Sequence, residues 1–148
     1  MTTTPTGQPE IVIVGAARTP QGKLNGQLAP FSGTELGSRA IQGALAQGGI
    51  DPAAVQAVIM GQVLQAGAGQ APARQAAIGA GIGWHAHATT VNKVCLSGLS
   101  AVIDAARLLR SGEAEVVVAG GMESMTNAPH LLPGSRRGWV YGEVPMID

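Results

Sequence analysis

Apolar residues along this chain follow two patterns that alternate, short continuous runs and longer segments with helical spacing. Continuous runs at residues 11–14, 57–60 and 116–118 are typical of buried strands in an α/β sheet. Residues 89–94 alternate in polarity and are rich in β-branched side chains, which predicts a further strand. Because helical segments separate these runs, the pattern predicts an α/β fold in which helices cover a sheet.

Two of the helical segments carry clear end signals. Ser32 and Glu35 have the spacing of a capping box, and the apolar face that follows them runs on to Gly48. Residues 71–77 predict a helix of small side chains with Pro72 in its first turn, a composition suited to close packing.

A third helix, amphipathic in pattern, is predicted to follow residues 89–94 and to end at Gly112. Its apolar positions are Leu99, Val102, Ile103, Ala106 and Leu109, and its polar positions are Ser100, Asp104, Arg107 and Ser111. Together with the strands on either side it makes a βαβ unit. We therefore expect a right-handed crossover between two parallel strands.

The only cysteine of the chain, Cys95, lies at the corner between residues 89–94 and this helix. The unpaired N–H groups and the positive dipole end of a helix favour a thiolate, and they offer donors to an oxyanion forming beside the sulfur. By composition alone, a lone cysteine is more often a small buried hydrophobic residue. Its position at the corner favours a nucleophile for acyl transfer instead.

Composition narrows the class of protein further. Of the 148 residues, 45% are hydrophobic, 3% aromatic and 12% charged, and the formal net charge is zero. A neutral chain with few charges offers no electrostatic footprint for nucleic acid or an anionic membrane, so we expect neither partner. With no apolar run of about 18 residues, no leader-like start and no second cysteine, the chain is predicted to be cytoplasmic.

Four motifs occur in order along the chain: Ala17-Arg18-Thr19-Pro20, Gly61-Gln62-Val63-Leu64-Gln65-Ala66-Gly67, Asn92-Lys93-Val94-Cys95 with Ser97-Gly98-Leu99, and residues 116–129 around Gly120-Gly121-Met122-Glu123-Ser124-Met125. Together they resemble the thiolases, in particular the acetyl-CoA acetyltransferases. The resemblance implies a layered α/β fold with a mixed five-stranded sheet and covering helices. It also implies that Cys95 is acylated by an acyl-CoA and that its own backbone N–H helps to hold the thioester oxygen.

The same resemblance implies an acyltransferase acting between coenzyme A thioesters, which forms acetoacetyl-CoA or cleaves 3-ketoacyl-CoA through an acyl-cysteine intermediate. Acyl-CoA and coenzyme A are then substrates, with no further cofactor and no metal, and the assembly is a homodimer or a homotetramer. The residues that contact coenzyme A stay unknown. One position departs from the family pattern, because Leu96 follows the cysteine where thiolases usually have glycine or alanine, and the preferred acyl-chain length is left open.

We divide the chain into a flexible tail at residues 1–9, an N-terminal thiolase α/β domain at 10–121 and the start of an incomplete loop region at 122–148. Periodicity stops in the last segment, which is rich in Gly and Pro. Since thiolases are much longer, we expect an N-terminal half that lacks the C-terminal domain and is nearly inactive in condensation alone. Two alternatives stay open: a non-catalytic dimerisation or regulatory module, and a condensing enzyme of the ketoacyl synthase type.

The chain has three histidines that are candidates for the base that thiolase chemistry needs. At about 3.3 Å per strand residue, His87 lies on the order of 25 Å from Cys95, at the wrong end of the predicted strand. His85 and His87 form a pair more typical of a solvated turn than of a metal site. His130 follows a strand that ends at the same edge as Cys95, but the resemblance assigns the catalytic histidines and a second cysteine to C-terminal motifs with no counterpart here.

Two polar residues follow the last predicted strand at the edge where Cys95 is expected. Ligands often bind at the carboxyl ends of parallel strands, so Glu123 and Asn127 are close to the predicted site. For both, a role in holding the loop or a subunit interface is favoured over a role in the chemistry.

Overall fold

A parallel three-stranded sheet forms the centre of the computed structural model, which describes residues 10–148; the predicted tail at residues 1–9 lies outside the described residues. The strands are ordered β2-β1-β3 and comprise β1 (Ala57–Gly61), β2 (His87–Val91) and β3 (Val117–Gly121). Gly61 is opposite both Val91 and Gly121, so all three carboxyl ends meet at one edge. The predicted α/β class is confirmed, and five strands stay a prediction for a longer chain.

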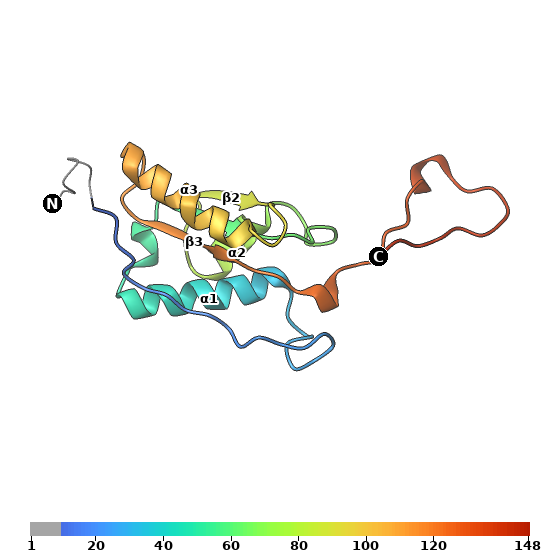
Figure 1. The fold of residues 1–148 in the computed structure, drawn as a ribbon, viewed down its shortest axis with the longest axis horizontal. Helices are drawn as coiled ribbons and strands as arrows, with labels where there is room; N and C mark the ends of the chain where they lie inside the picture. The colour runs from blue at the N-terminus through green and yellow to red at the C-terminus, as the bar shows by residue number, and fades with distance from the viewer. Residues whose placement is uncertain (1–9) are drawn as a thin grey trace.

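Helices cover both faces of the sheet (Figure 1). Val58 and Met60 pack with α1 (Gly33–Gly48) and α2 (Pro72–Gly79), whereas Ile59 packs against α3 (Ser97–Ser111). Successive residues of a strand point to opposite faces, so α2 and α3 lie on opposite sides of the sheet. The connections through α2 and α3 also run in opposite directions across the strand order, and the two crossovers therefore have the same hand.

The capping box predicted for α1 is present. The Ser32 hydroxyl accepts a hydrogen bond from the Glu35 N–H at 3.2 Å, and the Glu35 carboxylate accepts one from the Ser32 N–H at 2.8 Å. The helix ends at Gly48, and Gly49 follows it with φ +62° in the left-handed region that glycine favours. Local signals therefore define both ends of α1.

Helices α1 and α2 pack closely, as the small residues of α2 predict. A Cβ added to Gly37 in α1 would lie 3.3 Å from the Cβ of Ala76 in α2, which is tighter than an ordinary van der Waals contact. One helix also bonds to the other, because the Ser38 hydroxyl donates to the Ala76 carbonyl at 3.0 Å. Pro72 is the first residue of α2, where its missing N–H costs no hydrogen bond.

The prediction of a buried strand at residues 11–14 is wrong. Ile13 is 82% exposed, its neighbours Val12 and Val14 are exposed as well, and the segment has no strand assignment. A strand needs a neighbour to pair its backbone groups, and among the described residues β3 offers this segment no ladder. The chain instead runs along α1, where Gly15 lies against the Ala44 carbonyl.

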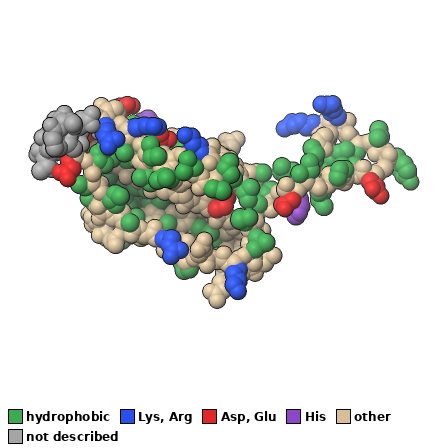
Figure 2. All heavy atoms as spheres, in the orientation of Figure 1, with side chains coloured by type: hydrophobic (Ala, Val, Ile, Leu, Met, Phe, Trp, Pro, Cys, Tyr) green, Lys and Arg blue, Asp and Glu red, His purple; other side chains and the backbone are tan. Residues whose placement is uncertain are grey.

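Helix α3 turns a different face to the sheet than its amphipathic pattern suggests. Small residues face the sheet, namely Ser97, Ser100, Ala101 and Ala105. The larger apolar side chains of Leu99, Val102 and Ile103 are exposed, and Figure 2 shows hydrophobic atoms gathered over this helix. Because α3 lies close to the sheet, only small side chains fit between them. The larger apolar side chains therefore lie on the outer face of α3.

Beyond β3 the chain forms an arm that projects away from the body of the molecule (Figure 1). One short 3-10 turn, η2 (Met125–Asn127), is bonded to the body before the arm begins, and a second, η3 (Ser135–Arg137), lies within the arm. Leu131 and Ile147 exchange two backbone hydrogen bonds of 2.7 and 2.9 Å, which close the base of the arm. The loss of periodicity after residue 121 corresponds to this irregular structure.

Candidate active site

Cys95 lies in a tight turn that joins β2 to α3. Strand β2 ends at Val91, so the chain leaves the sheet earlier than the predicted strand at residues 89–94. The Leu96 N–H then donates to the Lys93 carbonyl at 3.1 Å, and the Ser97 N–H donates to the Val94 carbonyl at 3.0 Å. Two overlapping turns therefore enclose Cys95, which lies just outside the first residue of the helix.

The residue before the thiol has a strained backbone. Val94 has φ +52°, a left-handed conformation that is costly for a β-branched side chain. Its N–H donates to the Asn92 side-chain oxygen at 3.0 Å, and its carbonyl accepts from the Ser97 hydroxyl at 2.6 Å. The sequence pattern does not predict this conformation. The one local signal was Asn92, whose side chain commonly bonds to the backbone two residues further on.

Glycines beneath the turn let α3 approach the carboxyl edge of the sheet. A Cβ on Gly61 would lie 2.5 Å from the Ser97 carbonyl carbon, so only glycine fits at the end of β1. Gly98 packs against the end of β3, where a Cβ added to it would contact Gly121 at an ordinary 3.6 Å. The Asn92 amide also donates to the Val63 carbonyl at 3.1 Å. These contacts fix the turn to the ends of the strands.

The thiol itself is accessible. Cys95 is exposed, and within residues 10–148 its backbone N–H donates to no acceptor. Leu96, the N-cap of α3, is 49% exposed. It makes no side-chain capping bond, because an apolar leucine side chain has no hydrogen-bond acceptor. The arrangement presents a thiol, a free backbone donor and an apolar side chain side by side.

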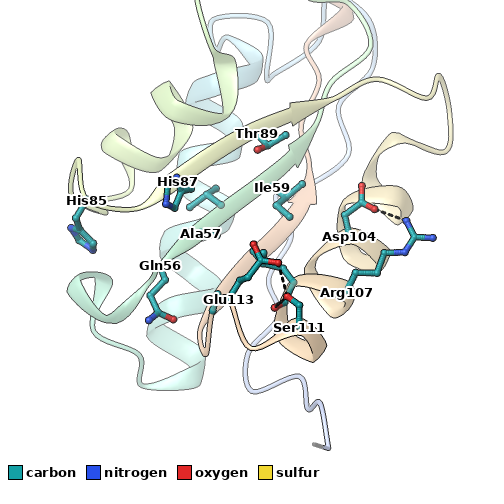
Figure 3. A pocket seen from close by; sticks show the side chains of 13 residues that line it. Gln56, Ala57, Ile59, His85, His87, Thr89, Asp104, Arg107, Ser111 and Glu113 are labelled. Atoms are coloured by element: carbon teal, nitrogen blue, oxygen red, sulfur yellow. Dashed lines mark hydrogen bonds and ion pairs between the residues drawn. The ribbon is translucent and has the colours of Figure 1, made fainter. Parts of the chain in front are cut away.

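The structure separates His85 and His87 from the thiol. His87 begins β2, whereas Cys95 follows the other end of that strand. Both histidines line a groove of about 880 Å³ between the start of the sheet and the C-terminal half of α3 (Figure 3). On this face of the sheet α3 lies over β3 and β1 and makes few contacts with β2, whose other face packs against α2. His130 lies in the exposed arm.

Glu123 and Asn127 hold loops together at the carboxyl edge. The Glu123 carboxylate accepts from the N–H groups of Val63 and Leu64 at 2.8 and 3.2 Å, which fastens the segment after β1 to the end of β3. The Asn127 amide donates to the Ala29 and Phe31 carbonyls, both at 2.9 Å. These bonds agree with the loop-holding role that the sequence favours for both residues.

No group of three or more His, Cys, Asp and Glu side chains placed to hold a metal ion occurs among residues 10–148. In the same part of the chain, no helix has the length and apolar character needed to span a membrane. A second hollow, of about 740 Å³, lies between residues 17–28, α1 and the segment after β3.

The α/β unit and the motifs at its carboxyl edge correspond to a known family. The family model described as the thiolase N-terminal domain matches residues 11–148. The chain therefore belongs to the thiolase family.

Similar proteins come from bacteria and plants. The chain is 59% identical over 137 residues to a probable acetyl-CoA acetyltransferase of Mycobacterium tuberculosis. The matched region covers 93% of this chain and 35% of that relative. It is 54% identical over 139 residues to an acetyl-CoA acetyltransferase of Cupriavidus necator, covering 94% of this chain and 35% of that protein. Acetyl-CoA acetyltransferase 2 of Arabidopsis thaliana is 52% identical over 139 residues, with 94% and 34% covered. The chain thus spans about a third of the length of these relatives.

Proposed function

We propose that this chain is the N-terminal part of an acyltransferase of the thiolase type, in which Cys95 carries the acyl group between coenzyme A thioesters. The placement of Cys95 carries this proposal. An exposed thiol lies in a strained turn before α3, with a free backbone N–H, at the edge where three parallel strands end. The printed names of the relatives favour acetyl-CoA as the acyl donor.

In the proposed first step, the Cys95 sulfur attacks the carbonyl carbon of an acyl-CoA. A new C–S bond forms, the C–S bond to coenzyme A breaks, and the thiol proton passes through a base to the departing coenzyme A thiolate. In this proposal the Cys95 N–H donates to the oxyanion that forms on the carbonyl oxygen, a type of stabilisation that contributes about 3 kcal/mol per donor in acyl-transfer enzymes. In condensation, a base takes an α-proton from a second acyl-CoA. The α-carbon then bonds to the carbonyl carbon of the acyl group, and the C–S bond to Cys95 breaks, which frees the Cys95 thiolate.

The positions of the histidines support a base outside these 148 residues. His85 and His87 lie at the far end of β2, and His130 lies in the arm. We propose that residues in the remaining two thirds of the relatives' length supply the base, the group that removes the α-proton, and a cover for the outer face of α3. On this account the present chain alone is nearly inactive in condensation.

The other parts of the proposal follow from the family. Acyl-CoA and coenzyme A are the substrates, with no further cofactor, and the complete protein is a cytoplasmic homodimer or homotetramer that binds neither nucleic acid nor membrane. Residues 10–121 form the N-terminal domain, and residues 122–148 begin a loop region.

The intact mass of the chain after incubation with acetyl-CoA tests the role of Cys95. We expect one acetyl group on the parent, its removal by free coenzyme A, and none on Cys95→Ala. A matched control is Ser100→Ala, which leaves the thiol in place and is expected to acetylate. The same assay on a chain extended to the relatives' length distinguishes a missing base from an unreactive cysteine.

Two outcomes would decide against this function. An acetyl group that persists in Cys95→Ala would place the acylation elsewhere. No adduct on either length of chain, with both folded by circular dichroism, would favour the alternative of a non-catalytic dimerisation or regulatory module. The match to the thiolase family model already favours a thiolase over a condensing enzyme of the ketoacyl synthase type.

A further inference from the structure

We propose that Ser97 is a positioning residue for Cys95, because its hydroxyl holds Val94 in the left-handed conformation that orients the thiol. This inference rests on the proposed function, since it takes Cys95 as the reacting group. It adds a residue that makes no contact with the substrate and acts only through the backbone on the N-terminal side of the thiol.

Ser97 bonds to both residues that precede Cys95. Its hydroxyl accepts from the Lys93 N–H at 2.8 Å and donates to the Val94 carbonyl at 2.6 Å, while its own N–H donates to the same carbonyl at 3.0 Å. The residue is 3% exposed, so water does not compete for these bonds. One buried side chain therefore ties the turn together across Cys95.

Ser97 is itself held in place by the sheet. Its carbonyl carbon lies where a Cβ on Gly61 would stand only 2.5 Å away, and Gly98 next to it packs against Gly121. The ends of β1 and β3 therefore fix the backbone from which the hydroxyl reaches the turn. A hydroxyl fixed in this way can hold a residue in a strained backbone conformation, because such a conformation persists only where the contacts around it outweigh its cost.

Val94 is the residue whose strained conformation the Ser97 hydroxyl holds. Without the Ser97 hydroxyl, the Asn92 side chain still accepts from the Val94 N–H, but the carbonyl of Val94 keeps only the bond from the Ser97 N–H. We expect Val94 to relax to a negative φ. That rotation turns the peptide between Val94 and Cys95 and moves both the Cys95 N–H and its sulfur away from the geometry needed at a thioester carbonyl.

The change to test is Ser97→Ala in the 148-residue chain, with two readouts. The first is the φ of Val94, measured from its HN–Hα coupling and backbone chemical shifts by NMR. The second is the rate of Cys95 acetylation by acetyl-CoA. Ser100→Ala is the matched control, because Ser100 is also 3% exposed and lies on the same face of α3.

We expect the left-handed signature of Val94 in the parent and in Ser100→Ala, and its loss in Ser97→Ala. Acetylation is expected to fall at least about tenfold in Ser97→Ala, since small misplacements of a reacting group have effects of this size. Adding Val94→Gly to Ser97→Ala should restore most of the rate, because glycine adopts a positive φ without the help of the hydroxyl. A serine with a merely structural role would show no such rescue.

Retention of the left-handed signature in Ser97→Ala overturns the proposal, and so does acetylation of that variant at the parental rate. If the 148-residue parent takes no acetyl group, acetylation is compared in the chain extended to the relatives' length, and the absence of an adduct there as well overturns the proposed function. The NMR comparison then decides on Ser97 alone: loss of the signature supports its hold on Val94, and retention overturns it.

Discussion

Gly61 and Ser97 lie backbone against backbone, so closely that a Cβ on Gly61 would stand 2.5 Å from the carbonyl carbon of Ser97. Replacement by alanine therefore forces α3 away from the end of β1. We expect Gly61→Ala to lower the free energy of unfolding by about 1 to 3 kcal/mol, as other overpacking changes do. Urea denaturation measures this loss.

Gly120→Ala is the matched control for that change. Gly120 lies in the neighbouring strand, and its added Cβ would approach the flexible Met60 side chain at an ordinary 3.6 Å. We expect a loss well below that of Gly61→Ala. Equal losses for the two variants would show that close approach is not what requires glycine at position 61.

The two faces of α3 should respond differently to substitution. Ala101 is 0% exposed against the sheet, so Ala101→Leu overfills a closed space and should cost about 1 to 3 kcal/mol. Val102, the next residue, is 42% exposed, and Val102→Leu should change stability by less than about 0.5 kcal/mol. Thermal unfolding of both variants checks the orientation of the helix. The reverse ranking would mean that the larger apolar face packs on the sheet.

The capping box gives α1 a pH-dependent contribution to stability. The pKa of the Glu35 carboxyl is lowered from its ordinary 4.5, chiefly by the hydrogen bond from the Ser32 N–H and then by the Ser32 hydroxyl. A lowered pKa means that the carboxylate stabilises the folded state above pH 4.5, and that this contribution is lost as the pH falls through the folded pKa. Glu35→Gln should therefore melt lower than the parent at pH 7, and the difference should close in acid.

Thermal midpoints of the parent and Glu35→Gln between pH 7 and pH 3 test this linkage. Ser32→Ala provides a second arm, because it removes one of the two Ser32 donors to the carboxylate together with the N-cap oxygen. It should cost about 1 kcal/mol at pH 7 and should shrink the effect of Glu35→Gln. A gap between parent and Glu35→Gln that stays constant down to pH 3 would contradict the lowered pKa.

Glu123 is predicted to contribute to stability through its loop. Glu123→Ala leaves the N–H groups of Val63 and Leu64 without their carboxylate acceptor, and we expect a loss of about 1 to 3 kcal/mol. Glu143→Ala, in the exposed arm, is the control and should stay within about 0.5 kcal/mol of the parent. Urea midpoints compare the two. A Glu123→Ala variant as stable as the control would leave the carboxylate without a structural role.

Features specified by nearby residues were predictable from the sequence. Ser32 and Glu35 define the start of α1 because their bonds span one helical turn, and Pro72 and Gly112 mark the start of α2 and the C-cap of α3 for equally local reasons. The corner that carries Cys95 was found in the same way, from a strand pattern followed by a helix pattern. The class of fold follows from the alternation of these elements.

Features that depend on distant partners were not predictable. Residues 11–14 have the composition of a buried strand, but a strand exists only beside a neighbour, and the pattern of one segment cannot supply it. The pattern of α3 likewise shows apolar positions without showing that Ala101 and Ala105, rather than Val102, would face the sheet. The left-handed Val94 depends on the Ser97 hydroxyl, whose position is set by packing against Gly61.

The sheet order β2-β1-β3 also has a kinetic consequence. Each strand pairing is parallel and closes only after a helical crossover, so the contacts that form the sheet are distant in sequence, and such topologies fold slowly. The turn at Cys95 follows the end of β2, and the residues after it pack against Gly61 of β1 and Gly121 of β3. Its geometry therefore exists only once all three strands have assembled, so a partly folded chain would hold the thiol without the turn that orients it.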